Sequence, residues 1–248
     1  MIPLKSEEDL KMLREAGKIL NRIIRKLEEA VKSGVSTEEI DNLAERLVAE
    51  EDCLPAFKGY RGFPASTCTS TNYVIVHGIP DEQRIKQGDI LSLDLGINYK
   101  GYFSDSAVTV PVGIIDSKLE KLIKVTKQAL SEGIKQAKVG NRLSNISCAI
   151  QDYVENNGFS VVRQFVGHGI GRSLHEEPEI PNFGQPDQGA VLKHGMVFAI
   201  EPMVNMGTWE SEILDNGWTA VTKDRQASAH FEHTVAITNQ GPEILTDN

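Results

Sequence analysis

The sequence predicts one α+β domain that is built from two similar halves. Helix-like periods are followed by strand-like runs, the same order recurs in the second half, and no Pro/Ser-rich linker separates the two. The 248 residues are 40% hydrophobic and 25% charged, which is typical of a soluble globular protein with a substantial core. We therefore expect a single domain over residues 1–248.

The first half opens with two predicted helices. Residues 6–9 resemble a helix N-terminus, and apolar residues from Leu10 to Leu27 continue at helical spacing. Residues 36–39 match a capping box, and the apolar positions between Ile40 and Val48 predict the buried face of a second helix.

Strand-like runs follow at 72–78, 89–99 and 101–113. The second half repeats this order, with a predicted helix over 117–137, another after Gly140, and strand-like runs that end at 195–202 and 228–238. A shift of 106 residues, which carries Gly34 onto Gly140, superposes the buried face of the second helix on that of the fourth. Identity between the halves is too low for a repeat array, but it indicates internal pseudo-symmetry.

Two aspartates point to a cation site in the first half. Lys100-Gly101 is typical of a two-residue hairpin loop, and that register places Asp94 and Asp105 on one face as diagonal neighbours, about 7–8 Å apart. The run around Asp94 is too apolar on both sides for an exposed strand, so a bound cation is favoured over a solvated surface.

The second half contributes Glu201 and Glu232, which also lie in apolar strand-like runs. Buried carboxylates are normally paired or bound to metal. Pseudo-symmetry would bring both acidic pairs to one centre, and an imidazole from residues 166–178 would complete it. Such an oxygen-rich set suits a pair of first-row divalent ions, about 3.5–4 Å apart.

The segment VGHGIGRSLHEEP, residues 166–178, fits neither of two simpler motifs. Its glycines follow G-x-G-x-G, whereas a dinucleotide-binding loop needs G-x-G-x-x-G before a helix. His175-Glu176 has no second histidine four residues after the first, as a helical zinc motif requires. The segment is better interpreted as one edge of a larger site, where glycines let the backbone approach closely.

Charge and cysteine usage restrict the remaining classes. A net charge of −9 argues against nonspecific binding to nucleic acid or anionic membranes. Three widely spaced cysteines indicate a reducing compartment. No apolar stretch approaches 18 residues, and the first residues are too acidic for a signal peptide, so we expect a cytoplasmic protein.

Taken with their flanks, these residues resemble the type I methionine aminopeptidases of the pita-bread fold. The resemblance covers nearly the whole chain. It rests on HGIP at 77–80, DLG with Asp94, the second aspartate Asp105, GHGIGRSLHEEP, AIEPM with Glu201 and FEHTVAIT with Glu232.

The resemblance implies a set of metal ligands and a reaction. The implied ligands of two divalent ions (Co, Mn, Fe, Zn or Ni) are Asp94, Asp105, His168, Glu201 and Glu232. Asp105 and Glu232 would bridge the ions, and the resulting hydroxide would attack the carbonyl that follows an N-terminal methionine. Glu201 would also carry a proton, while His77 and His175 would face the substrate.

A methionine pocket is implied as well, and its members are Tyr60, Phe63, Cys68 and Trp218. Cys68 is interpreted as a pocket wall, because no histidine is placed to activate it as a nucleophile. This chain departs from the commonest family pattern at Phe57, Arg61, Leu174 and His230, which bears on specificity. The expected partners are nascent chains and, transiently, the ribosome, and we expect a monomer.

Other members of this fold provide the alternatives. Aminopeptidase P and prolidase carry a large extra N-terminal domain, and type II methionine aminopeptidases have an insertion between the ligating histidine and the first glutamate. Residues 169–200 are too few for that insertion. Non-catalytic relatives that bind RNA, ribosomes or chromatin proteins lose ligands and gain basic tails, whereas this chain is acidic and keeps the full ligand set.

Overall fold

Helices α1 (Glu7–Ala30) and α2 (Thr37–Glu50) begin where their capping residues predict. In each case the N-cap serine accepts a hydrogen bond from the backbone N–H three residues later. The acidic side chain at that position accepts one from the serine N–H in return: Ser6 with Asp9, and Ser36 with Glu39. The computed structural model describes residues 2–247, and within them the predicted buried faces of both helices are confirmed.

The second helix pair, α3 (Ser117–Gln136) and α4 (Leu143–Asn156), repeats the first. Both bounds of α4 lie 106 residues after those of α2, so the predicted recurrence is confirmed. The cap is not repeated, because the N-cap Arg142 makes no side-chain capping hydrogen bond. The two halves therefore resemble each other more in where their helices lie than in how those helices are capped.

A hairpin of β4 (Ile90–Tyr99) and β5 (Tyr102–Pro111) carries the register of the first half. Both loop residues have positive φ, 52° at Lys100 and 81° at Gly101, as a type I′ turn requires. The predicted pairing is confirmed along the whole hairpin, including Asp94 opposite Ala107 and Gly96 opposite Asp105.

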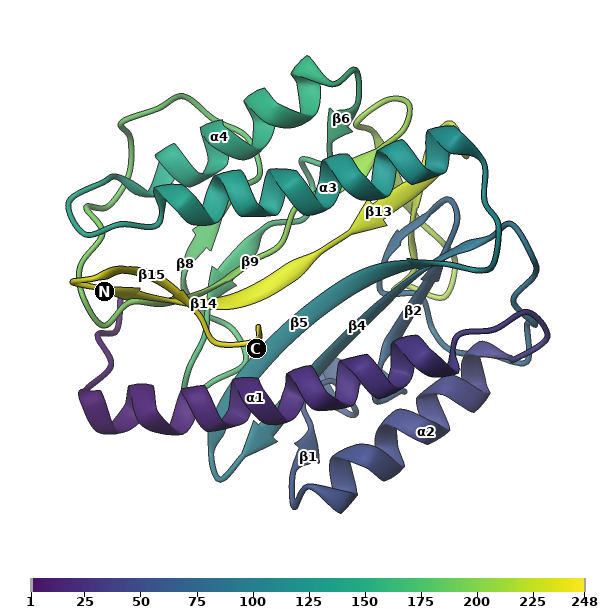
Figure 1. Cartoon of the computed structure of the whole chain (residues 1–248), viewed down its shortest axis with the longest axis horizontal. Helices are drawn as coiled ribbons and strands as arrows, with labels where there is room; N and C mark the ends of the chain where they lie inside the picture. The colour runs from purple at the N-terminus through teal and green to yellow at the C-terminus, as the bar shows by residue number, and fades with distance from the viewer. Residues whose placement is uncertain (1, 248) are drawn as a thin grey trace.

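The central sheet is antiparallel and joins the two halves side by side (Figure 1). Within the described range its path runs β1-β4-β5-β14-β9-β7-β8, with β2 added to β4 and β15 to β14. The other strands of this sheet are β1 (Leu54–Pro55), β2 (Cys68–Thr71), β7 (Gly167–Gly169), β8 (Glu176–Ile180), β9 (Val197–Ile200), β14 (Glu232–Thr238) and β15 (Gly241–Ile244). The junction between β5 and β14 is where the first half meets the second.

Two small sheets flank the central one. One contains β6 (Ser160–Val161), β10 (Met203–Asn205) and β13 (Ser228–His230), and the other contains β3 (Val74–Val76), β11 (Ser211–Ile213) and β12 (Ala220–Thr222). The prediction of one continuous strand over 228–238 is wrong. The run divides at Phe231, because His230 pairs with Met203 of the small sheet whereas Glu232 pairs with Ala107 of the central one.

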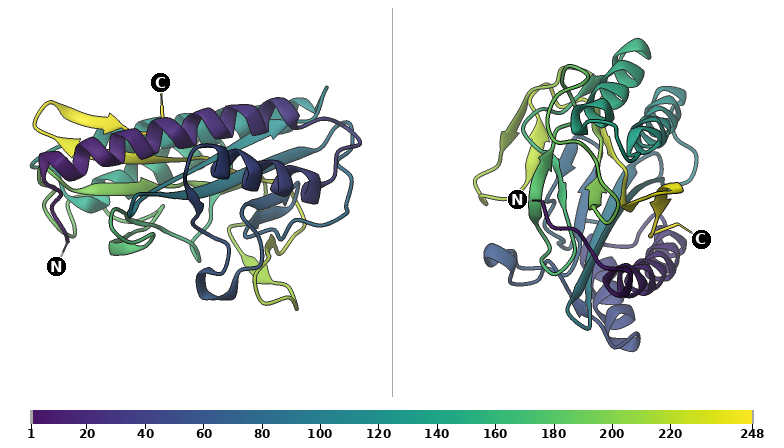
Figure 2. Two further views of the ribbon diagram at one scale, coloured as in Figure 1. Left: turned by 90° about the horizontal axis from the view of Figure 1, so that it is seen from below. Right: turned by 90° about the vertical axis from the view of Figure 1, so that its left-hand side faces the viewer.

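The helices cover one face of the central sheet and leave the other to loops. One apolar cluster lies beneath α1 and α2, and a second lies beneath α3 and α4. Figure 2 shows that the loops after β1 and around β11 project from the side opposite α1. A short 3₁₀ helix, η1 (Tyr60–Gly62), lies in the first of these loops. This opposite face is therefore where a site can be built without disturbing the core.

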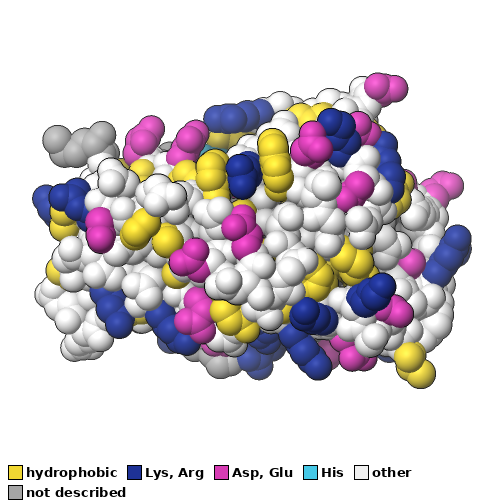
Figure 3. Space-filling view, turned by 90° about the horizontal axis from the view of Figure 1, so that it is seen from above, with side chains coloured by type: hydrophobic (Ala, Val, Ile, Leu, Met, Phe, Trp, Pro, Cys, Tyr) yellow, Lys and Arg dark blue, Asp and Glu magenta, His cyan; other side chains and the backbone are white. Residues whose placement is uncertain are grey.

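The described helices include none that is long and apolar enough to cross a lipid bilayer. On the face shown in Figure 3, which looks onto the molecule from the side of α3 and α4, acidic and basic side chains are interspersed without a continuous basic area. Together with the acidic net charge, this mixture means that the face lacks the basic surface that binding to a nucleic acid requires.

Gly17 provides a test of how α1 is docked. A Cβ at this position would lie 2.1 Å from the backbone oxygen of Leu245, so the helix packs directly on the C-terminal segment. We predict that Gly17→Ala lowers the free energy of unfolding by about 1–3 kcal/mol, measured by denaturant titration. Lys18→Ala is the matched control in the same helix and should stay within about 0.5 kcal/mol. An equal effect of the two substitutions would contradict this docking.

Candidate active site

Four carboxylates meet on one face of the sheet, from β4, β5, β14 and the residue that follows β9. Ala107 of β5 pairs on one side with Asp94 of β4 and on the other with Glu232 of β14, so these residues form a row across the sheet. Asp105 lies two residues before Ala107 and therefore on the same face. Glu201 follows β9 directly, next to the pairing of Ile200 with β14. Both halves thus deliver acidic groups to one place, as the sequence predicts.

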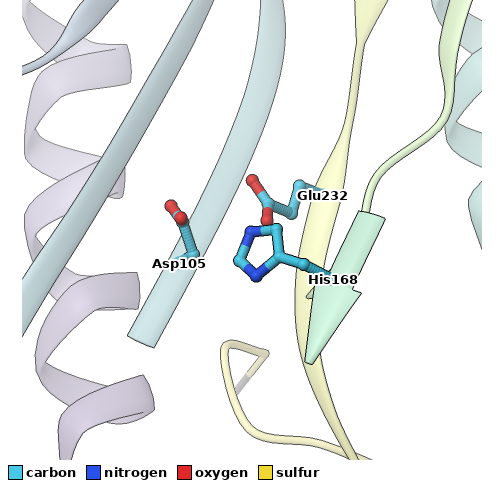
Figure 4. A group of neighbouring side chains, drawn as sticks. All are labelled: Asp105, His168 and Glu232. Carbon is cyan, nitrogen blue, oxygen red and sulfur yellow. The ribbon is translucent and has the colours of Figure 1, made fainter. Parts of the chain in front are cut away.

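His168 reaches the carboxylates from β7, where it pairs with Ala199 of β9. Its Nδ1 lies 2.9 Å from the carbonyl oxygen of Gly169. A carbonyl can only accept, so Nδ1 carries the proton and Nε2 keeps its lone pair. Nε2 is 3.6 Å from Oε1 of Glu201, and the side chains of Asp105, His168 and Glu232 converge (Figure 4), each offering a ligand atom within 4.8 Å of the others.

The acidic cluster is electrostatically unfavourable without a cation. Burial raises the pKa of Asp105 to about 7, and burial together with the neighbouring acids raises the pKa of Asp94, Glu201 and Glu232 well above their ordinary values. Oδ1 of Asp94 and Oε1 of Glu232 are buried without a hydrogen-bond partner. Unpartnered carboxylate oxygens beside a neutral imidazole are a donor set that fits divalent metal ions.

Every residue predicted for the site lines one cavity of about 260 Å³. The predicted residues are Tyr60, Phe63, Cys68, His77, Asp94, Asp105, His168, His175, Glu201, Trp218 and Glu232. Among the departures from the family pattern, Phe57, Arg61 and Leu174 also line it. Val76, Gln164, Phe165 and Val166 complete the wall and were not predicted, although each lies within a few residues of a predicted histidine.

The two predicted substrate-facing histidines occupy different walls. The His175 ring stacks on Tyr60 with centroids 5.1 Å apart, and its centroid is 4.2 Å from that of His168. His77 lies edge-on to Phe165 at 5.5 Å, and its backbone is held at a φ of 59°. Burial lowers the pKa of His77 to about 4 and that of His175 to about 3, so both rings are neutral near pH 7.

The apolar part of the cavity contains Phe63, Trp218 and Cys68. Phe63 and Trp218 pack edge to face at 5.2 Å. Cys68 pairs with Asp94 across β2 and β4, and burial together with that carboxylate raises the pKa of its thiol well above the ordinary value. A thiol that stays protonated is a poor nucleophile, which fits the interpretation of Cys68 as a wall.

His230 has a closer relation to the site than its sequence suggested. Its imidazole is 1% exposed, and Nε2 lies 3.5 Å from Oε2 of Glu201. In the sequence, His230 stands out only as a departure from the family pattern. Its position two residues before Glu232 was the available signal, but the strand break at Phe231 removes the regular alternation that such an argument needs.

The glycines beside His168 allow strands to approach closely. A Cβ on Gly167 would lie 2.4 Å from the carbonyl oxygen of Ala199, and one on Gly169 would lie 2.2 Å from that of Glu177. Real Cβ atoms do not tolerate such distances, so the prediction of close backbone approach is confirmed at these positions. The approach sets His168 tightly between its two neighbouring strands.

Known proteins resemble this chain along its whole length. Residues 11–239 match the model of metallopeptidase family M24. The methionine aminopeptidase of Clostridium perfringens is 52% identical and methionine aminopeptidase 1 of Bacillus subtilis is 51% identical, each with 99% of both chains covered. The crystal structure of methionine aminopeptidase from Thermotoga maritima superposes with a TM-score of 0.98 at 43% identity, over 100% of both chains.

Proline-specific relatives of the same fold resemble this chain more weakly. A prolidase from Pyrococcus furiosus shares the fold with a TM-score of 0.81 at 24% identity, and this chain covers 65% of it. The methionine aminopeptidases, in contrast, are matched from end to end at much higher identity. With its buried carboxylates and single imidazole on one sheet face, this chain belongs to metallopeptidase family M24 and, within it, to the methionine aminopeptidases.

Proposed function

We propose that this protein removes the N-terminal methionine from nascent proteins whose second residue is small. The observation that carries the proposal is the single cavity in which four buried carboxylates and His168 meet two neutral histidines and an apolar wall. The related proteins named methionine aminopeptidases support it through identity over the whole chain. A cavity of about 260 Å³ suits one side chain and the adjoining peptide group.

The family is one of metallopeptidases, so the enzyme uses divalent metal. We propose that Asp94, Asp105, His168, Glu201 and Glu232 hold two ions, with Asp105 and Glu232 between them. Bound divalent ions supply Lewis acidity and lower the pKa of water toward neutrality. The same ligand types accept Co, Mn, Fe, Zn or Ni.

The protein's own groups would handle the proton and the substrate. Glu201, with its raised pKa and its carboxylate between His168 and His230, is suited to accept a proton and pass it to the leaving amine. His175 would donate a hydrogen bond to the carbonyl oxygen as negative charge develops there. His77, on the opposite wall, would contact the peptide nitrogen beyond the scissile bond.

The apolar wall would bind the methionine side chain, with Phe63, Cys68 and Trp218 around it and Tyr60 at the rim. We further propose a cytoplasmic monomer of one domain that meets nascent chains through transient ribosome association. The family match over residues 11–239 supports a single domain, and the lack of a membrane-crossing helix among the described residues is compatible with this location.

Asp105→Asn should have opposite effects with and without metal. Dinuclear metal binding and activity should be lost, because two cations would lack a bridging carboxylate. In metal-free protein the substitution should raise the melting temperature by roughly 2–4 °C, since it removes a buried charge.

The raised pKa of Asp105 determines at which pH Asp105→Asn stabilises the metal-free protein. Burial raises the Asp105 pKa from 3.8 to about 7, so the stability gained by protonating this carboxyl is present below about pH 4 and is lost as the pH rises through 7. The advantage of Asp105→Asn should therefore be larger at pH 8 than at pH 5, by calorimetry with chelator. Near-normal turnover, or a metal-free variant less stable than the wild type at pH 8, would count against the bridging role.

His175→Ala should lower kcat by roughly 10²–10³-fold and change KM much less, because the hydrogen bond is needed mainly in the transition state. Steady-state kinetics on Met-Ala-Ser at saturating metal would measure this. A change confined to KM would mean that His175 only holds the substrate.

Substrate choice should depend on the second residue. If Tyr60, His77 and the loop of His175 form the rim, Met-Xaa-Ser peptides with Gly, Ala, Ser, Thr, Pro, Val or Cys should be cleaved. Peptides with Leu, Ile, Phe, Lys or Glu should be slower by about a hundredfold or more. Released methionine is the readout, and Xaa-Pro peptides without methionine serve as the control for a prolidase. Efficient cleavage of Met-Leu-Ser would show that the rim is open.

A further inference from the structure

Lys5 is buried and forms an ion pair with Glu176. The two side chains are 6% and 12% exposed, and they are 171 residues apart in the sequence. Lysine is seldom buried unless its charge is paired. The pair therefore joins the segment before α1 to the first residue of β8, where the loop that carries His175 ends.

Glu176 also organises the loop itself. Its Oε1 accepts hydrogen bonds from the backbone N–H groups of Arg172, at 2.7 Å, and of Ser173, at 3.2 Å. One carboxylate thus closes the turn over residues 172–176, and Lys5 neutralises that carboxylate from the other side. His175 is the residue directly before Glu176, inside the closed turn.

Lys5 is held in place by two close glycine contacts. Its N–H donates to the carbonyl oxygen of Gly195 at 2.7 Å. A Cβ on Gly171 would lie 2.2 Å from Cε of Lys5, and a Cβ on Gly195 would lie 2.7 Å from the Lys5 oxygen. Gly171 therefore leaves room for the Lys5 side chain, while Gly195 lets the Lys5 backbone pass close by, and both contacts keep Lys5 beside Glu176.

The ring of His175 depends on this loop for its position. The ring itself contacts Tyr60, on which it stacks, and His168. Because His175 directly precedes Glu176, the turn that Glu176 closes also holds the backbone from which the ring projects. A shift of about 1 Å in a catalytic donor is enough to reduce a rate strongly.

We infer that Lys5 and Glu176 are positioning residues for His175. Their ion pair anchors the turn over 172–176 so that the imidazole of His175 lies at the height of the scissile carbonyl. The inference rests on the proposed role of His175 and extends it to a residue that lies outside the cavity.

The test compares Lys5→Met with Arg14→Met. Arg14 forms an ion pair with Glu243 at 2.7 Å, so its loss removes a second link between the N-terminal region and a distant segment, but one that does not touch the loop. Lys5→Met should lower kcat on Met-Ala-Ser by roughly tenfold or more with little change in KM. Lys5→Arg should restore part of the loss, and Arg14→Met should leave kcat within about twofold of the wild type.

Glu176→Gln provides an independent variant in case Lys5→Met folds poorly. It keeps an acceptor for the two backbone N–H groups and removes the charge that Lys5 pairs with. Hydrogen exchange of metal-free protein gives a readout without turnover: amides of residues 171–177 should exchange faster in Lys5→Met and Glu176→Gln, and at the wild-type rate in Arg14→Met.

A double-variant comparison separates positioning from general stability. If Lys5 acts through His175, Lys5→Met should slow the His175→Ala enzyme by less than twofold. A full additional loss in that background, or a normal kcat and normal exchange in both Lys5→Met and Glu176→Gln, overturns the inference. If His175→Ala itself is unimpaired, the proposed role of His175 fails first. An impaired His175→Ala beside a normal Lys5→Met shows that only the inference has failed.

Discussion

The mutual repulsion of four buried carboxylates is the constraint on which this structure depends. Asp94, Asp105, Glu201 and Glu232 come from strands of both halves and share one face of the sheet. Their raised pKa values and unpartnered oxygens mean that the folded state carries an electrostatic cost that bound cations would relieve. If the proposed ions bind there, metal binding and the joining of the two halves would be coupled, because the ions would neutralise charge at the seam where β5 meets β14.

The register of the strands decides whether these carboxylates meet on one face of the sheet. A slip of one residue between β4 and β5 would place Asp94 and Asp105 on opposite faces of the sheet, one of them among the apolar side chains beneath the helices. The positive φ angles of Lys100 and Gly101 set the register at one end. At the other side of the site, Gly167 and Gly169 let β7 lie close to its neighbours, so His168 reaches the acidic cluster.

Local chemistry made the helices, the hairpin and the clustering of the carboxylates predictable from sequence. The caps at Ser6 and Ser36, the Lys100-Gly101 turn and charged residues within apolar runs are each signals within a short window. The break at Phe231 and the approach of His230 to Glu201 depend on which distant strand each residue pairs with. The contact of Lys5 with Glu176 likewise has no local sign, since a lysine before an acidic helix start is ordinarily solvated.

The anchoring of Lys5 has a consequence for how the chain folds during synthesis. A polypeptide emerges with its amino end first, yet the partners of Lys5 are Glu176 and Gly195, which emerge after most of the chain. Helix α1 can pack on β4 and β5 early, whereas the segment before it must wait with its charge unpaired. Closing so long a loop is entropically slow, so docking of the segment before α1 belongs among the last folding steps. Given the positioning role inferred for Lys5, a newly made enzyme would gain full activity only after this segment has docked against Glu176 and Gly195.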